Sequence, residues 1–186
     1  IRVAKIKVLP KIFPREQLRV DRKRVDLSPK NLKRYLKEKK ILDSLYTKKN
    51  NQALFKLKFK KPLESKVTSV YGTQRVFNKK KKGQHLGIDY RAAVGTPINS
   101  SNSGKVVLSQ DLFFTGKTII VDHGMGIFTM YGHLSKLKVA KGDIVSQGSI
   151  LGLAGKTGRV TGPHLHWGVK VQQNWVDGNS LIKATK

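Results

Sequence analysis

The chain has 186 residues, with 38 Lys and Arg against 11 Asp and Glu, and it contains no Cys. A chain of this length is expected to form one domain with at most a small appendage, and to bury a core without disulfides. Lack of Cys excludes disulfides and thiolate metal sites, so any metal must be bound by His, Asp or Glu.

The net charge of +27 is densest near the N-terminus, where residues 1–66 hold 22 Lys and Arg and 6 Asp and Glu. Such a charge favours an anionic partner: nucleic acid, an acidic membrane surface or an anionic cell-wall polymer. A solvated basic surface is an equal alternative. There is no apolar run of membrane-spanning length and no signal-peptide pattern. Because the chain starts at Ile1 rather than Met, we expect a fragment or a mature form.

A first, basic region is predicted over residues 1–63. Its first ten residues alternate apolar and basic side chains, which indicates a half-exposed strand. A helix follows, with Ser28 as N-cap and Pro29 as first helical residue. The helix is expected to bury an apolar stripe, within this chain or against another one, made of Leu32, Tyr35, Leu36, Leu42 and Leu45. Residues 53–63 alternate again and predict a strand leading into the second region.

A second region, residues 64–186, is predicted to be mainly β. Short β-branched or apolar runs recur between turn signals, including "VTSVY", "GKVVLSQ", "KTIIVDHG", "GIFTMYGHL", "GDIVSQGSILGLAG", "HLHWGVKV" and "NWVDG". Many short strands with regular turns predict an antiparallel sandwich or barrel-like fold. The basic run between Asn78 and Gln84 is expected to be a solvated loop.

The stretch "GPHLHWGV" places two histidines in a strand pattern. Side chains two apart on a strand share a face, so His164 and His166 project together while Leu165 and Trp167 point into a core. Neutral imidazole is the commonest metal ligand. The pair therefore indicates either metal binding or catalysis, or two ordinary polar positions on a solvent face.

The stretch "HLGID" places His85 and Asp89 four residues apart. On a straight strand their Cα atoms would be about 13 Å apart, too far to share one ion easily. A helix is disfavoured by Gly87 and the nearby "VGTP". We therefore expect a bent or bulged strand with its bend at Gly87, the alternative being a solvated loop.

The remaining histidines are His133, at the end of a strand, and His123, expected to be an ordinary residue of a Gly-rich turn. Joined together, these patterns predict a zinc site of two His and one Asp with an open fourth position, as in catalytic zinc centres. The other His residues would serve as acid–base partners.

"HLGID", "YGHLS" and "GPHLHWGV", in this order, resemble the signature of the lysostaphin-like (LytM-type) zinc metallopeptidases, and the resemblance extends over about residues 66–178. It implies an antiparallel β-sheet domain with a substrate groove and one zinc ion per chain. By motif match, His85, Asp89 and His166 would bind the zinc. His164 and His133 would be catalytic residues beside it, and which of them is the general base stays open.

The resemblance, strongest to Gram-negative envelope members, implies a zinc endopeptidase that cuts peptide cross-links in peptidoglycan, with the D-alanyl bond to a diamino acid as the expected target. The alternative is a non-catalytic LytM-type activator or binding module of cell-wall enzymes. Expected partners are peptidoglycan stem peptides and another envelope protein at residues 1–63. Nucleic acid is not expected, because aromatic stacking motifs do not accompany the basic runs. A periplasmic location is expected, secreted or anchored through a segment outside this chain.

Overall fold

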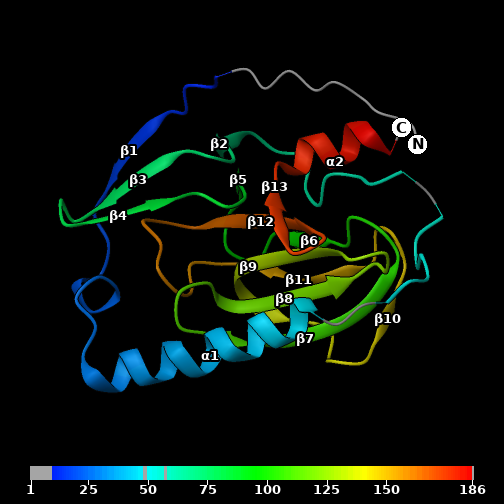
Figure 1. The fold of residues 1–186 in the computed structure, drawn as a ribbon, viewed down its shortest axis with the longest axis horizontal. Helices are drawn as coiled ribbons and strands as arrows, with labels where there is room; N and C mark the ends of the chain where they lie inside the picture. The colour runs from blue at the N-terminus through cyan, green and yellow to red at the C-terminus, as the bar shows by residue number, and fades with distance from the viewer. Residues whose placement is uncertain (1–9, 48–49, 57, 186) are drawn as a thin grey trace, which may run out of the picture.

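A computed structural model describes residues 10–47, 50–56 and 58–185. A ten-stranded sheet runs in the order β10-β7-β8-β9-β12-β5-β2, with β11 joining β9 to β6 and β13 at the end of β12 (Figure 1). A three-stranded sheet, β1-β3-β4, lies beside it. Pairings in the large sheet are antiparallel, which confirms the predicted mainly β antiparallel fold. The strand predicted for residues 1–10 falls almost wholly outside the described residues.

The elements have the following bounds: β1 (Arg15–Leu18), η1 (Arg22–Arg24), α1 (Pro29–Thr47), β2 (Val67–Ser69), β3 (Gln74–Phe77), β4 (Lys81–Gln84), β5 (Ile88–Arg91), β6 (Pro97–Asn99), β7 (Gly104–Leu112), β8 (Gly116–Asp122), β9 (Ile127–Leu137), β10 (Ile144–Val145), β11 (Ile150–Ala154), β12 (His164–Val171), β13 (Asn174–Val176) and α2 (Gly178–Ala184). No helix of the described residues is long and apolar enough to span a membrane.

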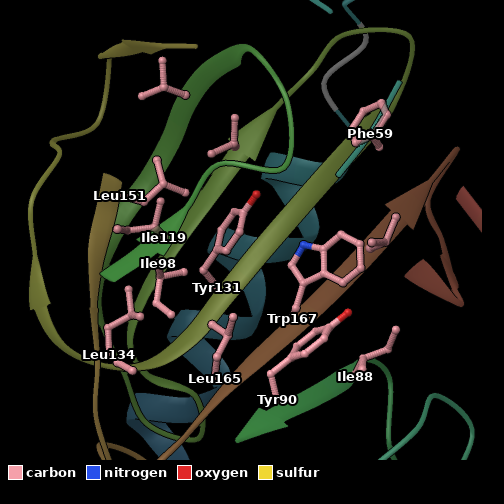
Figure 2. Close-up of a cluster of buried hydrophobic side chains, with 14 of the residues drawn as sticks. Phe59, Ile88, Tyr90, Ile98, Ile119, Tyr131, Leu134, Leu151, Leu165 and Trp167 are labelled. Atoms are coloured by element: carbon pink, nitrogen blue, oxygen red, sulfur yellow. The ribbon is translucent and has the colours of Figure 1, made fainter. Parts of the chain in front are cut away.

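The main core lies against β5, β8, β9, β11 and β12, and its aromatic centre is made of Tyr90, Tyr131 and Trp167 (Figure 2). Truncating a buried side chain as large as Trp167 costs about 3–5 kcal/mol of stability. Phe59, from the predicted first region, is buried in this same core. The division between residues 63 and 64 stays a prediction, with the described part of the first region packed onto the second.

Strand β12 is central, because it pairs with β9 on one side and with β5 on the other. Leu165 and Trp167 are fully buried in the core. His164 and His166 therefore project from the opposite face, as the alternation predicts. A central strand has little freedom to move, which holds both imidazoles in place.

Helix α1 begins as predicted, since the Ser28 hydroxyl accepts a hydrogen bond from the Asn31 amide at 3.3 Å. The N-terminal half of the predicted stripe is not buried within this chain, since Leu32 and Leu36 are 43% and 47% exposed. The helix instead turns Glu38 inward, and the Glu38 carboxylate accepts a hydrogen bond from the Phe113 amide at 2.7 Å. The face of α1 that carries Glu38 therefore lies against the domain, and the two leucines remain exposed.

Two predicted backbone conformations are also wrong. The described residues of 53–63 form no strand; this extended segment makes isolated backbone hydrogen bonds, such as that from Lys60 to Ser101. The expected loop before Gln84 contains strand β4, which pairs with β3 and is exposed along its length. Lysine-rich composition indicates solvent exposure, but an exposed strand is as compatible with it as a loop.

His123 lies in a turn, as predicted, but it is fully buried rather than an ordinary turn residue. Its Nδ1 lies 2.8 Å from the Ser103 carbonyl oxygen and its Nε2 lies 2.7 Å from the Thr129 hydroxyl. Burial lowers the pKa of His123 from 6.5 to about 4, while the hydrogen bond to Ser103 acts in the opposite direction. The folded protein therefore holds this imidazole neutral.

His123 is expected to make stability depend on pH. His123 binds a proton in the unfolded chain as pH falls through about 6.5, whereas in the folded chain it does so only near 4. The contribution of the neutral His123 to the free energy of unfolding is therefore complete above pH 6.5 and is lost as pH falls toward 4. The destabilisation caused by His123→Gln should therefore shrink by about 2–3 kcal/mol between pH 7 and pH 4.5. Urea unfolding of the metal-free proteins measures this difference.

Thr129→Val is the matched control, because it removes the hydroxyl that contacts His123 Nε2 but keeps the imidazole. Its destabilisation should change far less with pH. An equal destabilisation by His123→Gln at the two pH values would contradict the expected role of His123.

Candidate active site

His85, Asp89 and His166 come together from two sheets. Asp89 and His166 lie directly opposite each other on the paired strands β5 and β12. His85 follows β4, which belongs to the three-stranded sheet, and the chain crosses from there into β5. The site thus forms where the two sheets meet.

The crossing depends on a bend at Gly87, as predicted. A Cβ atom at this position would lie 2.6 Å from the Cε1 atom of His166 and 2.6 Å from the carbonyl oxygen of Trp167. Only a residue without a side chain allows the backbone to pass this close to β12. The bend shortens the distance between His85 and Asp89, so that their side chains touch.

Three electron-pair donors converge in this cluster. His85 Nε2 lies 3.0 Å from Asp89 Oδ1 and 3.0 Å from His166 Nδ1, and the last two atoms are 2.9 Å apart. His85 Nδ1 must carry a proton, because its neighbour at 2.9 Å is the Val70 carbonyl oxygen. In a neutral ring Nε2 is then an acceptor facing other acceptors. A neutral His166 can donate an Nδ1 proton to only one of these acceptors at a time, whereas a metal ion placed among the three atoms could accept electron pairs from all of them.

This donor set fits a zinc ion. Two imidazole nitrogens and one carboxylate oxygen are ligand types that zinc accepts, and three such ligands leave a position for water or substrate. All three side chains are buried, and their ligand atoms lie within 4.8 Å of one another. The cluster therefore has the ligand types expected of the metal site predicted from the sequence.

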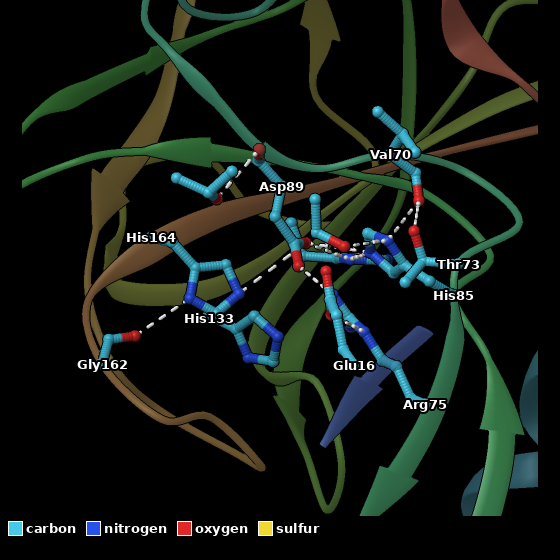
Figure 3. A network of polar contacts seen from close by, with 12 residues as sticks. Glu16, Val70, Thr73, Arg75, His85, Asp89, His133, Gly162 and His164 are labelled. Carbon is cyan, nitrogen blue, oxygen red and sulfur yellow. Dashed lines mark hydrogen bonds and ion pairs between the residues drawn. The ribbon is translucent and has the colours of Figure 1, made fainter. Parts of the chain in front are cut away.

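A second layer of contacts orients the cluster. Arg75 donates to Asp89 Oδ2 at 2.5 Å and to Glu16 of strand β1 at 3.1 Å (Figure 3). Outer contacts of this kind fix ligand orientation and tune metal affinity. Neither Arg75 nor Glu16 was predicted. Arg75 lies in the stretch "YGTQRVFN", where nothing local in the sequence indicates that it pairs with Asp89.

The charge state of the cluster follows from its burial. Burial by itself raises the pKa of Asp89, but the interactions of its carboxylate with His166 and His85 outweigh burial and hold that pKa well below its usual range. Burial lowers the pKa of His166, against the opposite effect of Asp89. Asp89 is thus ionised and His166 favours its neutral form, as metal ligands must be.

His164 and His133 lie side by side next to this cluster, with ring centroids 4.8 Å apart (Figure 3). His164 Nδ1 is 2.9 Å from the Gly162 carbonyl oxygen, and His133 Nδ1 is 2.8 Å from the Thr157 carbonyl oxygen. Both carbonyls require a protonated Nδ1, which leaves Nε2 as the acceptor in the neutral rings. His164 Nε2 lies 3.7 Å from Asp89 Oδ1.

The backbone and the pKa of His133 are both unusual. Its φ is +64°, a left-handed value that is uncommon for non-glycine residues and that is found at functional sites. Burial lowers the pKa of His133 well below its usual value, and the nearby His164 and His166 lower it further. The ring is therefore neutral, with Nε2 unprotonated.

The five predicted site residues line a groove of about 660 Å³ that runs past the His-Asp-His cluster. The first region contributes one wall, through residues of β1 and α1 such as Glu16, Tyr35 and Leu42. The predicted substrate groove is thus present, and the predicted site residues His85, Asp89, His133, His164 and His166 all lie along it.

The antiparallel sheet has the fold of a lysostaphin-like peptidase domain. The groove beside it, lined by a His-Asp-His cluster and two further histidines, has the site of such a domain. The model of peptidase family M23 matches residues 83–178, a span that includes all five predicted site residues. The chain belongs to peptidase family M23.

Curated relatives and solved structures support the assignment to this family. The peptidoglycan DD-endopeptidase ShyA of Vibrio cholerae is 38% identical over 128 residues, which are 67% of this chain and 30% of that protein. A Pseudomonas aeruginosa peptidase M23 structure has a TM-score of 0.73 at 36% identity, covering 86% of this chain and 65% of that one. The catalytic domain of Staphylococcus simulans lysostaphin has a TM-score of 0.58 at 32% identity, covering 64% of this chain and 92% of that domain.

The chain spans less than a third of the length of the first curated relatives that it matches, 30% of ShyA and 22% of ShyB. The comparisons therefore establish the family and the fold of this domain.

Proposed function

We propose that the chain is a zinc-dependent endopeptidase that hydrolyses peptide cross-links in bacterial peptidoglycan. The observation that carries the proposal is the convergence of His85, Asp89 and His166 beside His133 and His164 in one groove. Relatives named as peptidoglycan DD-endopeptidases, ShyA and ShyB of Vibrio cholerae, support the substrate and the bond class. A periplasmic location is part of the same proposal.

His85, Asp89 and His166 would hold one zinc ion per chain. When bound, zinc supplies Lewis acidity that lowers the pKa of a coordinated water and polarises a carbonyl group. Arg75 keeps Asp89 oriented toward the cluster, and the Val70 carbonyl keeps the Nδ1 proton of His85 away from it.

His164 and His133 would carry the proton transfers. With Nδ1 of each ring committed to a backbone carbonyl, Nε2 is free to accept a proton from the attacking water and to return it to the leaving amine. An imidazolium at either position would also stabilise the negative charge that develops on the scissile carbonyl oxygen. The arrangement supports both residues as candidates for the general base.

The described part of residues 1–63 supports the groove in this proposal. Strand β1 pairs in parallel with β3 and presents Glu16 to Arg75, while α1 lies along β7. A contact between this region and another envelope protein stays a prediction from the sequence.

Digestion of purified peptidoglycan sacculi tests the proposed reaction. Cross-linked peptide dimers are expected to become monomers, measured by chromatography and mass analysis, while glycan strands keep their length. Shortened glycan strands would contradict the proposal. Zinc-loaded protein that leaves the sacculi unchanged would favour the alternative of a non-catalytic activator.

Metal removal tests the proposed cofactor. About one zinc per chain is expected after dialysis, measured by atomic emission, because three ligands form one site. A strong chelator should abolish hydrolysis, and added zinc should restore it. Hydrolysis that continues after complete metal removal would show that the cluster does not act through a metal.

A further inference from the structure

Arg159 lies in the segment between β11 and β12, and this segment also orients both catalytic histidine candidates. Thr157 supplies the carbonyl oxygen that contacts His133, and Gly162 supplies the one that contacts His164. Arg159 lies between these two residues in the chain and lines the same groove. Its position is thus tied to the site where hydrolysis is proposed to occur.

The backbone at Arg159 is held firmly. The Arg159 amide donates to the Phe114 carbonyl at 2.8 Å, and the Thr157 hydroxyl lies 2.8 Å from the Leu134 carbonyl. Gly158 has a φ of +81° and packs so closely that a Cβ would lie 2.5 Å from the Phe114 carbonyl oxygen. Because these contacts fix the backbone of the segment, the Arg159 side chain has a defined position.

The Arg159 guanidinium is held between aromatic rings rather than by a carboxylate. It lies 3.9 Å from the Phe77 ring centroid and 4.4 Å from that of Phe114. Rings hold a guanidinium by its faces and leave its edge donors free. Burial lowers the pKa of Arg159 to about 10, and the charge of Arg75 lowers it too, so the group stays charged at neutral pH.

The acidic residues that line the groove are engaged elsewhere. Glu16 and Asp89 both pair with Arg75, and Glu38 pairs with Arg34. Within the described part of the chain, Arg159 forms no ion pair. A half-buried cation with free donors and no internal counter-charge is suited to an anionic group of a ligand.

We infer that Arg159 binds a free carboxylate of the cross-linked stem peptide, and that the domain selects cross-links that carry this carboxylate over amidated ones. The inference rests on the proposed function. A stem peptide offers carboxylates on its diamino acid and on its D-glutamate, and the planar guanidinium edge matches a carboxylate in a two-point contact. Arg159 is thus a specificity residue for the substrate.

Binding of a peptide that cannot be cleaved tests the inference. The probes are the free stem peptide in three forms: both carboxylates free, the diamino acid amidated, and the D-glutamate amidated. Calorimetry with the wild-type chain is expected to show one amidation weakening binding by about ten- to a hundredfold, the range for a charge-assisted contact. In Arg159→Gln, that amidation should change affinity by less than about threefold.

Three further variants complete the design. Arg24→Gln is the matched control, because Arg24 also stacks on a ring, that of Phe113, at 4.5 Å, but is not among the groove residues; it should keep the wild-type preference. Arg91→Gln removes an exposed groove cation opposite His164. Arg159→Lys keeps the charge but not the planar edge, and an intermediate preference is expected. Thermal unfolding and zinc content confirm that each variant is folded.

The outcomes separate the inference from the proposed function. A preference that survives in Arg159→Gln, that disappears in Arg91→Gln instead, or that is missing in the wild type overturns the inference. Cleavage of cross-links without any preference leaves the proposed function standing and rejects the carboxylate site. A preference in binding without cleavage supports the carboxylate site and rejects the endopeptidase.

Discussion

His164→Ala is expected to keep about one zinc per chain and to lower the rate of cross-link hydrolysis by about 100- to 10,000-fold, the usual loss for a general acid–base residue. His166→Ala is expected to lose most of its zinc affinity, and its activity with it. His166 Nδ1 contacts both His85 Nε2 and Asp89 Oδ1, within 3.0 Å. His164 Nε2 lies farther out, 3.7 Å from Asp89 Oδ1.

Zinc content and hydrolysis rate should be measured on the same preparation of each variant. His133→Ala belongs in the series as the second candidate base, and the variant with the larger loss of rate at full zinc content identifies the stronger contributor. His123→Gln is the matched control, since His123 is buried but lies outside the site. Full zinc in His166→Ala, or lost zinc in His164→Ala, would show that the two roles are reversed.

Gly87→Ala is expected to damage the proposed zinc site although it changes none of His85, Asp89 and His166. The added methyl group would meet the His166 ring and the Trp167 carbonyl at 2.6 Å, and the carbonyl belongs to a central strand that cannot yield easily. We expect the free energy of unfolding to fall by about 1–3 kcal/mol, as for overpacked sites. Because the His166 ring must move, zinc affinity should fall by about ten- to a hundredfold.

Gly162→Ala is the control for this substitution. Gly162 is close to the site in sequence and its carbonyl orients His164, but a Cβ there meets nothing within 4 Å. Zinc titration and urea unfolding of the two variants give the comparison. Equal zinc affinity in Gly87→Ala and the wild type would show that the bend tolerates a side chain.

Local patterns in the sequence were sufficient for much of the site. Spacing by two puts His164 and His166 on one face of a strand whatever the strand pairs with, because the alternation is a property of the backbone. The Ser28-Pro29 pair marks the start of α1 for the same local reason. The bend at Gly87 was also predictable, since His85 and Asp89 meet only if the strand is broken between them.

The resemblance of the histidine motifs to a known family supplied the grouping of His85, Asp89 and His166, which no local pattern could provide. These residues are up to 81 positions apart, and they meet because β5 and β12 pair in one particular register. Shifting that register by one residue would move His166 to the other face of the sheet.

The sequence alone determined the strand-rich fold, the face shared by the two histidines and the residue types able to bind a metal, since all three depend on neighbours in the chain. Contacts between distant segments set the buried face of α1, the link from Asp89 through Arg75 to Glu16, and the position of Arg159 against Phe77 and Phe114. Each of these contacts joins segments distant in sequence. Its formation depends on packing geometry, which composition and periodicity do not encode.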